Sequence, residues 1–459
     1  MGIRKRTRRL FIPVFVLGLS LGGCVTNNFP GSHTAKADKF RQALNAGDTK
    51  SAQDYLLSKK ESEDNMLYMM ELGRIYNLQN QHPQSLDALG IVVEKFEQND
   101  SKALISAGSA ADHAQAALVN DTMIEYKGYG FERIFTHVNQ VFNYLGEGKN
   151  EDALIEVRKI ALEERELTDA HEKEIAKTAE KAKKNNINTA MLDSNFSGID
   201  LIAGKTKSSF SNAYAHYLSG VLMEATGKAS DKEFALTSYK LAFEIHPGST
   251  MIQKDIERLS GKGIRQSSEV DSEKGTLVVL YEDDFVAKRT GITIPIPTAS
   301  GSAVAVSFPM YTKESVPPVQ NLQVSGNGVS VTTVELTNTS ALAAKSLKEE
   351  IPAMVLRAVI RVAAKYAIQD QAGKQWGDAG KLVAGLYNVA SEQADLRNWL
   401  TLPNSCQVAR VPVVGGKQTL ALQSGGINTS VDVDIQPGKT TLVRAVNVGQ
   451  RLLVNTYQL

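Results

Sequence analysis

The sequence predicts an α+β protein of more than one domain, in which a helical N-terminal half precedes a β-rich C-terminal half. From Asp38 to about Leu259, apolar residues recur at three- and four-residue intervals, the spacing of amphipathic helices. Beyond residue 275, short β-branched segments lie between turn residues, as strands do. A chain of 459 residues is long enough to bury more than one hydrophobic core.

Residues 1–23 have the pattern of an export signal. Five basic residues lie between Arg4 and Arg9, and an apolar segment follows from Leu10 to Leu21. That segment is shorter than the roughly 20 residues needed to span a bilayer, and Pro13 interrupts it. We therefore expect a cleaved signal peptide, with an uncleaved membrane anchor as the alternative.

The sequence Leu-Gly-Gly-Cys that ends at Cys24 resembles the lipobox of bacterial lipoproteins. The resemblance implies that Cys24 carries fatty acyl chains such as palmitate, becomes the mature N-terminus and anchors the protein to a membrane. Val25 and Thr26 follow, without the aspartate that commonly retains such proteins at the inner membrane. We expect attachment to the periplasmic side of the outer membrane, with the inner membrane as the alternative.

Charge and cysteine content exclude two further features. The chain has 51 basic and 50 acidic residues, and loss of the five basic residues of the signal leaves the mature chain near −4. Such a chain has no electrostatic basis for binding nucleic acid. Cys24 and Cys406 are the only cysteines, so acylation of Cys24 leaves no pair for an internal disulfide. We expect Cys406 to be a small buried apolar residue.

We expect residues 24–37 to form a flexible tether and residues 38–260 to form the helical domain. Parts of that domain resemble tetratricopeptide repeats, in which small residues let paired helices approach and aromatic residues fill the gap to the next pair. No copy is complete, so an irregular helical bundle is the alternative. We also expect a solvated helix over residues 172–186 and a long loop over residues 187–209. The repeat pattern is carried by Leu72, Gly73, Tyr76, Ser85 and Leu89, then Tyr144, Ala153, Val157 and Ile160, then Gly220, Ala235, Tyr239, Ala242 and Pro247.

Residues 261–274 indicate a linker, and residues 275–459 indicate a β-sandwich-like domain with a helical insert at about 341–394. Within the insert, the pattern predicts one helix over 341–371 and a second over 378–394. Asn327-Gly328 signals a hairpin turn, because both residues tolerate positive φ. The segments predicted as strands are 276–281, 293–297, 303–308, 329–336, 407–413, 417–422, 430–435, 440–445 and 452–456.

The most specific segment is the run Ala-Asp-Leu-Arg-Asn-Trp-Leu-Thr-Leu-Pro at residues 394–403, followed by Gln-Val-Ala-Arg at 407–410. Together with Tyr281-Glu282 and the lipobox, it resembles a family of uncharacterised bacterial lipoproteins with a helical-repeat N-terminal half. The resemblance implies no activity, because none is established for that family.

Three residues of this run, Asp395, Arg397 and Trp399, form the candidate structural or binding motif. A bidentate Arg–Asp pair and a buried tryptophan would fix how the helical insert docks on the sheet. A binding site for a partner or a glycan is the alternative, and catalysis is a third.

No motif in the sequence predicts a catalytic site, a metal site or a cofactor. The seven histidines lack metal-binding spacing, and neither a nucleophile elbow nor a phosphate-binding glycine loop occurs. Glu282, Asp283 and Asp284 are adjacent in an extended segment, so neighbours point to opposite faces and make a poor catalytic pair. We expect these acids to pair at the surface with Lys288 and Arg289.

These patterns favour a non-enzymatic cell-envelope lipoprotein that acts as a scaffold or partner-binding protein, with the membrane and envelope proteins as its partners. Helical repeats form an extended concave face suited to a protein segment, and Tyr68, Tyr76 and Tyr144 are candidate contact residues. One alternative is a peptidoglycan- or glycan-binding protein that acts through the β-rich domain. A hydrolase is the remaining alternative.

Overall fold

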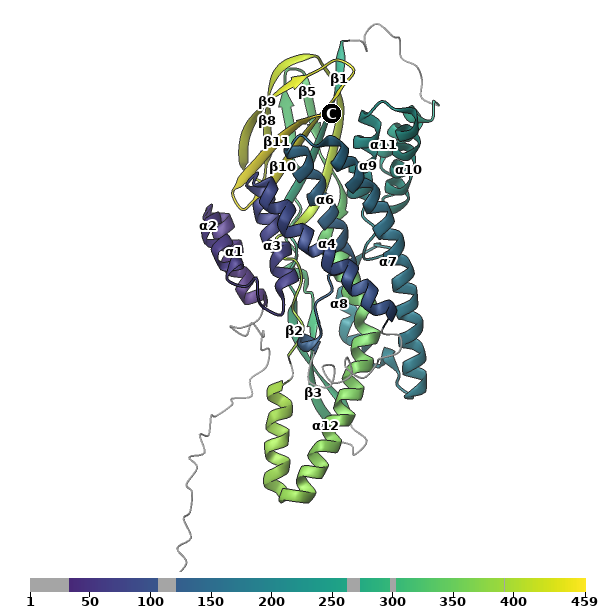
Figure 1. Cartoon of the computed structure of the whole chain (residues 1–459), viewed down its shortest axis with the longest axis vertical. Coiled ribbons are helices and arrows are strands. Elements are labelled where there is room, and N and C mark those ends of the chain that lie inside the picture. Colours follow the sequence, from purple (N-terminus) through teal and green to yellow (C-terminus); the bar gives the residue numbers. More distant parts are fainter. Residues whose placement is uncertain (1–32, 106–120, 262–272, 298–302, 392) are drawn as a thin grey trace, which may run out of the picture.

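The computed structural model describes residues 33–105, 121–261, 273–297, 303–391 and 393–459. A helical N-terminal half is followed by a half built of mixed sheets, which confirms the predicted α+β class (Figure 1). The predicted signal peptide, Cys24 and most of the predicted tether lie outside these ranges. Within the described ranges, no helix is long and apolar enough to cross a membrane.

Helices fill the first half of the chain. The first begins at His33, inside the segment predicted to be a tether, because Thr34 and Ala37 are buried against the body. The segment predicted to be a solvated helix, 172–186, lies mostly in α7, and most of its side chains are exposed. The α-helices are α1 (His33–Ala46), α2 (Thr49–Leu57), α3 (Asn65–Leu78), α4 (His82–Ile105), α6 (Gly130–Gly146), α7 (Asn150–Lys184), α8 (Ser197–Ala203), α9 (Ala213–Ala225), α10 (Ala229–Ile245) and α11 (Thr250–Leu259).

Three helix pairs pack as the repeat pattern predicts, α3 with α4, α6 with α7 and α9 with α10. Gly73 of α3 lies so close to α4 that a Cβ there would stand 2.6 Å from the side chain of Leu89. A Cβ on Gly220 of α9 would meet the ring of Tyr239 in α10 at 2.5 Å. The Ser85 hydroxyl donates to the Gly73 carbonyl at 2.7 Å. Small residues therefore set the helix spacing in the first and third pairs.

The loop predicted over residues 187–209 is wrong, because this segment contains a 3₁₀ helix, η3 (Thr189–Phe196), and then α8. Leu192, Phe196 and Ile199 follow each other at four- and three-residue spacing and are all buried. Both elements pack against α12 (Thr339–Ser391), the helix of the predicted insert. The apolar face of these two elements is buried in the core, whereas a loop would run over the surface.

The second half of the chain is built mainly of strands. Among the described residues, one sheet has the order β11-β10-β1-β7-β6, a second has the order β5-β4-β8-β9, and β2 and β3 form a hairpin. Only β1 and β10 pair in parallel; the other described pairs are antiparallel. The strands are β1 (Lys274–Phe285), β2 (Thr290–Pro297), β3 (Ala303–Met310), β4 (Gln323–Gly326), β5 (Val329–Thr332), β6 (Val334–Asn338), β7 (Pro403–Val414), β8 (Gly416–Ser424), β9 (Ile427–Ile435), β10 (Thr440–Val448) and β11 (Arg451–Gln458).

The single strand predicted over residues 329–336 is wrong, because the chain changes sheets at Thr333 between β5 and β6. The Thr333 hydroxyl donates to the side-chain oxygen of Gln407 at 2.7 Å and accepts from the Leu322 amide at 2.9 Å. A buried crossing point between two packed sheets needs such partners for its polar groups.

The two larger sheets pack face to face, as in a sandwich. Leu277 and Val279 on one face of β1 share a hydrophobic cluster with Leu422 of β8. Val278 and Leu280, on the other face of β1, belong to a second cluster that includes the helices. β1 is therefore buried on both faces, which accounts for its uninterrupted apolar run. The body has three layers, with the five-stranded sheet between the four-stranded sheet and the helices.

The insert forms one α-helix, α12, where the sequence predicted two. Residues 372–377, the segment expected to separate the two, are themselves helical. Its first part packs against η3, α8 and β3. Figure 1 shows α12 leaving the body beside β3 and folding back at its far end.

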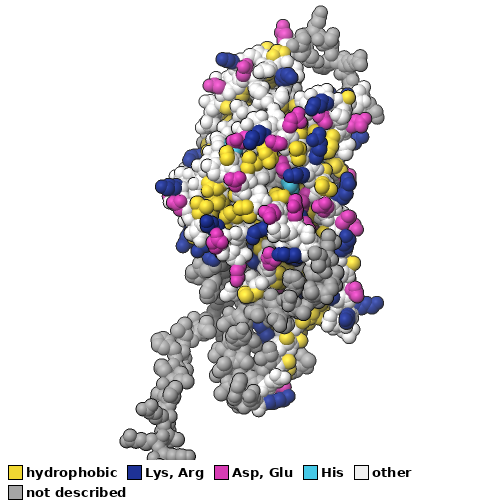
Figure 2. Space-filling model, viewed as in Figure 1, with side chains coloured by type: hydrophobic (Ala, Val, Ile, Leu, Met, Phe, Trp, Pro, Cys, Tyr) yellow, Lys and Arg dark blue, Asp and Glu magenta, His cyan; other side chains and the backbone are white. Residues whose placement is uncertain are grey.

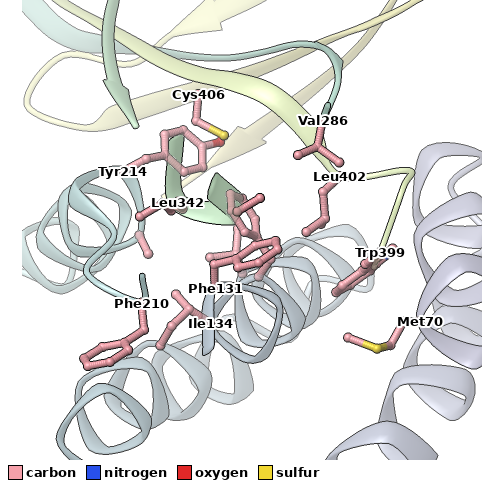
Figure 3. Packing of buried hydrophobic residues seen from close by; sticks show 14 of the residues in the cluster. Met70, Phe131, Ile134, Phe210, Tyr214, Val286, Leu342, Trp399, Leu402 and Cys406 are labelled. Carbon is pink, nitrogen blue, oxygen red and sulfur yellow. The ribbon is translucent and has the colours of Figure 1, made fainter. Parts of the chain in front are cut away.

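The helical half and the β-rich half share one hydrophobic core (Figure 3). Phe131 of α6, Leu402 and Cys406 belong to this cluster, and so does Trp399, which lies on the α3 side near Met70. The first helix of each pair, α3, α6 and α9, supplies side chains to this contact. The inner side of the helical repeats, predicted to bind a partner segment, is therefore covered by the protein's own chain.

Candidate functional site

Polar groups gather where the helices meet the segment 395–402, and Arg397 lies at their centre. Its guanidinium makes a bidentate pair with Asp395, with Nε–Oδ1 at 2.9 Å and Nη2–Oδ2 at 2.7 Å. It also donates to Asp64 at 2.8 Å and to the Ile124 carbonyl at 2.9 Å. Although burial lowers the pKa of Arg397, its hydrogen bonds and charge interactions with Asp395 and Asp64 raise it overall. Arg397 thus joins the end of the insert to the segments before α3 and α6.

Trp399 follows this pair and is completely buried. Its backbone amide donates to Glu132 of α6 at 2.6 Å, and its indole Nε1 donates to the Thr401 hydroxyl at 3.1 Å. Glu71 of α3 accepts from the amides of Leu400 and Thr401 at 2.6 and 3.0 Å. The predicted docking of this motif on the sheet therefore needs correction. Two helix carboxylates hold its backbone, so it docks on α3 and α6.

Glu132 is buried, and within the part of the chain that the structure describes its hydrogen-bond donors are uncharged groups. Besides the Trp399 amide, it accepts from the Tyr126 hydroxyl at 2.6 Å and the Tyr129 amide at 2.8 Å. Burial raises the pKa of Glu132 to about 7, against the opposing effect of these hydrogen bonds. Three donors fix the side chain, so it acts as a rigid receptor for the 395–402 segment.

A second polar cluster joins α3 to the five-stranded sheet through Glu282 of β1. Arg444 of β10 donates to Glu282 at 2.7 and 3.1 Å, and Arg74 of α3 donates at 2.5 Å. All three side chains are about 2 % exposed. Burial acts to raise the pKa of Glu282, but the two guanidiniums lower it to about 2. The predicted surface pairing of Glu282 is wrong, because the apolar run of β1 carries it into the core.

Asp283 points to the opposite face of β1, as strand alternation requires. It accepts from the Tyr281 hydroxyl at 2.7 Å and the Gln320 amide at 2.8 Å. The predicted partners of Lys288 and Arg289 are also wrong, and Arg289 does not lie at the surface. Lys288 pairs with Asp38 of α1 at 2.7 Å, and the buried Arg289 lies 4.3 Å from the centre of the Tyr129 ring.

A third cluster joins α9, α11 and β7. Arg410 of β7 donates to both carboxylate oxygens of Glu224 at 3.0 Å, and Arg258 makes a second bidentate contact with the same group. The Tyr239 hydroxyl donates to Glu224 at 2.8 Å. Burial acts to raise the pKa of Glu224, but the two arginines lower it to about 2. We call these three clusters, centred on Arg397, Glu282 and Glu224, the polar seam.

The chemistry of the seam is that of a permanent contact. Its carboxylates are bound to guanidiniums or backbone amides, and burial raises the pKa of the Cys406 thiol. Within the described ranges, no group of histidine, cysteine, aspartate and glutamate is arranged to hold a metal ion. Tyr68, a predicted contact residue, is buried, whereas Tyr76 and Tyr144 are half-buried.

The sequence singled out Asp395, Arg397 and Trp399 but not several other charged residues of the polar seam. Glu71 and Arg74 stand in the apolar run of α3, and Arg444 stands in the apolar run of β10. A charged residue in an otherwise apolar element signals a buried pair, because burial of an unpaired charge is too costly. The identity of each partner depended on contacts between residues hundreds of positions apart.

Comparison with known proteins returned no family model, no curated protein and no solved structure that matches this chain. The resemblance to a lipoprotein family therefore stays a prediction from the sequence.

Proposed function

We propose that the protein is a non-enzymatic lipoprotein of the bacterial cell envelope, and that it acts as a rigid scaffold held at the periplasmic face of the outer membrane. The observation that carries this proposal is the polar seam. Because the inner side of the repeats is bound to the sheet, the helices brace the β-rich half. Partners would then bind outer surfaces whose relative positions are fixed.

The position of α1 supports a short tether. The Thr34 hydroxyl lies 3.5 Å from the Leu396 carbonyl, next to the end of α12. Between Cys24 and His33 the chain reaches about 30 Å when fully extended. A lipid on Cys24 would therefore hold the α12 side of the body close to the bilayer. On the helical face seen in Figure 2, positive and negative side chains are mixed and lie among patches of hydrophobic side chains.

The test is crosslinking in cells, followed by recovery of partners with the wild type and with Cys24→Ser. We expect the wild type in the outer-membrane fraction with an acylated thiol, and we expect Cys24→Ser in the soluble periplasm with fewer partners. An unmodified Cys24 by mass spectrometry, or a wild-type protein recovered from the cytosol, would overturn the proposal.

A further inference from the structure

The outer face of the four-stranded sheet carries two neighbouring rows of uncharged side chains. Residues paired across antiparallel strands share a face, so the strand register places the outer residues in rows. One row is Thr332, Gln323, Gln423 and Asn428, and the next is Ser330, Ser325, Ala421 and Ser430. All eight are exposed, and none is charged.

All of these residues except Ser430 line a hollow of about 340 Å³. Gln323, Gln423 and Asn428 supply amides, and Ser325 and Ser330 supply hydroxyls. We call this site the amide hollow. In Figure 2 the surface over β8 and β9 is mostly white, while charged side chains crowd the surface over the helices. The hollow is within the size range of small-ligand sites.

The lining chemistry narrows the class of ligand. No lining residue is basic, which disfavours a polyanion, and none is acidic, which disfavours a cation. Of the exposed lining side chains only that of Ala421 is apolar, which gives a hydrophobic segment little to contact. An uncharged ligand rich in hydrogen-bonding groups remains.

The place of the hollow in the sheet disfavours an added peptide strand. It lies over β4 and β8, and each of these strands is already paired on both sides. Strand addition needs an open edge with free backbone groups. Recognition in the hollow must therefore use side chains. Amides and hydroxyls both donate and accept hydrogen bonds, which matches the hydroxyl and acetamido groups of a saccharide.

We propose that the amide hollow binds an uncharged saccharide, such as the glycan strand of the cell wall. The hollow lies on the layer farthest from the helices, at the end of the molecule away from α12 (Figure 1). The scaffold proposal names no ligand, whereas this inference assigns a saccharide to the outer face of the four-stranded sheet. Saccharide binding here does not require the lipid on Cys24.

The test uses the full-length protein in detergent and measures its retention on purified cell-wall sacculi. Soluble oligomers of N-acetylglucosamine and isolated wall peptides serve as competitors. We expect retention of the wild type and its displacement by the oligosaccharide. The double substitution Gln423→Ala/Asn428→Ala should lower retention at least fivefold, and Ser325→Arg, which fills the hollow, should abolish it. All three sites are exposed, so the melting temperature should stay within a few degrees.

Lys417→Ala is the matched control. Lys417 is exposed in β8 beyond the hollow, and its substitution should leave retention unchanged. Wild-type retention by both hollow variants, displacement by wall peptides alone, or no binding of the wild type to either sacculi or oligosaccharide would overturn the proposal. We expect Cys24→Ser to be retained on sacculi as strongly as the wild type. That result would show that saccharide binding does not depend on the lipid anchor, so the two proposals can fail independently.

Discussion

Glu282 shows how one residue joins distant parts of the chain. Its carboxylate lies between Arg74 from α3 and Arg444 from β10, and none of the three reaches solvent appreciably. A buried ion pair of this kind adds little net stability compared with apolar packing, but loss of one partner is costly because charge is left unpaired. Here loss of the acid would leave two buried guanidiniums facing each other.

We therefore expect Glu282→Gln to lower the free energy of unfolding by about 3–5 kcal/mol at pH 7, the range for breaking a buried pair. Chemical denaturation followed by circular dichroism measures this change. The control is Asp434→Asn, an exposed acid on β9, with an expected change within about 0.5 kcal/mol. A loss below about 1 kcal/mol for Glu282→Gln would show that the charge network is not needed for folding.

The pH dependence of Glu282 has a definite sign. Its folded pKa of about 2 lies below the ordinary value of 4.5. The stabilisation by this ionised group is fully present above pH 4.5 and is lost as the pH falls through about 2. Glu350 of α12 behaves in the opposite way, because burial raises its pKa to about 7 against the effect of Arg289 and Arg357. Between pH 4.5 and 7 this carboxyl ionises in the unfolded state but stays protonated in the folded state, so the folded state loses relative stability as the pH rises.

Glu350→Gln tests this sign. The substitution removes a group that is costly to ionise, so the variant should gain stability relative to the wild type as the pH rises. Between pH 4.5 and 8.5 we expect the difference in unfolding free energy to shift in favour of the variant by about 2–3 kcal/mol, from about 1.4 kcal/mol per pKa unit. Denaturation curves at several pH values measure it. Glu314→Gln, at an exposed site, should show no such shift, and a flat difference for Glu350→Gln would contradict the assignment.

At the scale of elements, the helix pairs depend on glycines at their points of closest approach. A Cβ on Gly220 would stand 2.5 Å from the Tyr239 ring, so Gly220→Ala should force α9 and α10 apart and cost about 1–3 kcal/mol. Gly90 of α4 is the matched control, because it is exposed and a Cβ there meets nothing within 4 Å. Gly90→Ala should instead stabilise the protein by up to about 1 kcal/mol, since alanine favours helix.

Thermal denaturation of the two alanine variants measures these changes as shifts in melting temperature. If Gly220→Ala and Gly90→Ala changed the melting temperature in the same direction, close approach at Gly220 would not set the spacing of this pair.

Local pattern predicted the elements better than their partners. The Asn327-Gly328 turn has the positive φ values expected, 47° and 83°, and the helix–strand order follows the periodicity of the chain. The parallel pairing of β1 with β10 depends on contacts across more than 150 residues, which no local pattern encodes. The change of sheet at Thr333 was hidden because residues 329–336 form one continuous segment rich in β-branched residues, with no turn residue between β5 and β6.

The same limit applies to the polar seam. The sequence marked Arg397 and Trp399 as unusual. However, Glu132, which accepts from the Trp399 amide, and Glu71, which accepts from the Leu400 amide, lie in helices more than 260 positions away. One acidic residue in an otherwise apolar helix predicts a buried carboxyl group, but the pattern does not show which residue binds it. The amide hollow was also out of reach, because its lining combines residues from β4, β5, β8 and β9.

At the scale of the whole molecule, the shared core predicts that the two halves unfold together. Residues from both halves form one hydrophobic cluster, and Trp399 lies where α3, α6 and the 395–402 segment meet. A separate β-rich domain would leave one face of the five-stranded sheet, with Arg444 and Glu282, exposed. Cooperative units of a protein follow such contacts, whatever the order of the elements along the chain.

Trp399→Ala should therefore destabilise both halves by a similar amount, about 3–5 kcal/mol, through loss of the buried ring. Native-state hydrogen exchange measures this, with amides of α3 and α6 compared with those of β1 and β10. We expect protection to fall equally in both sets, because opening either one breaks the shared core. Val414→Ala, at an exposed site on β7, should leave both sets unchanged. Wild-type protection in β1 and β10 together with loss of protection in α3 and α6 would mean that the sheet is stable alone, so the helices could not be its brace.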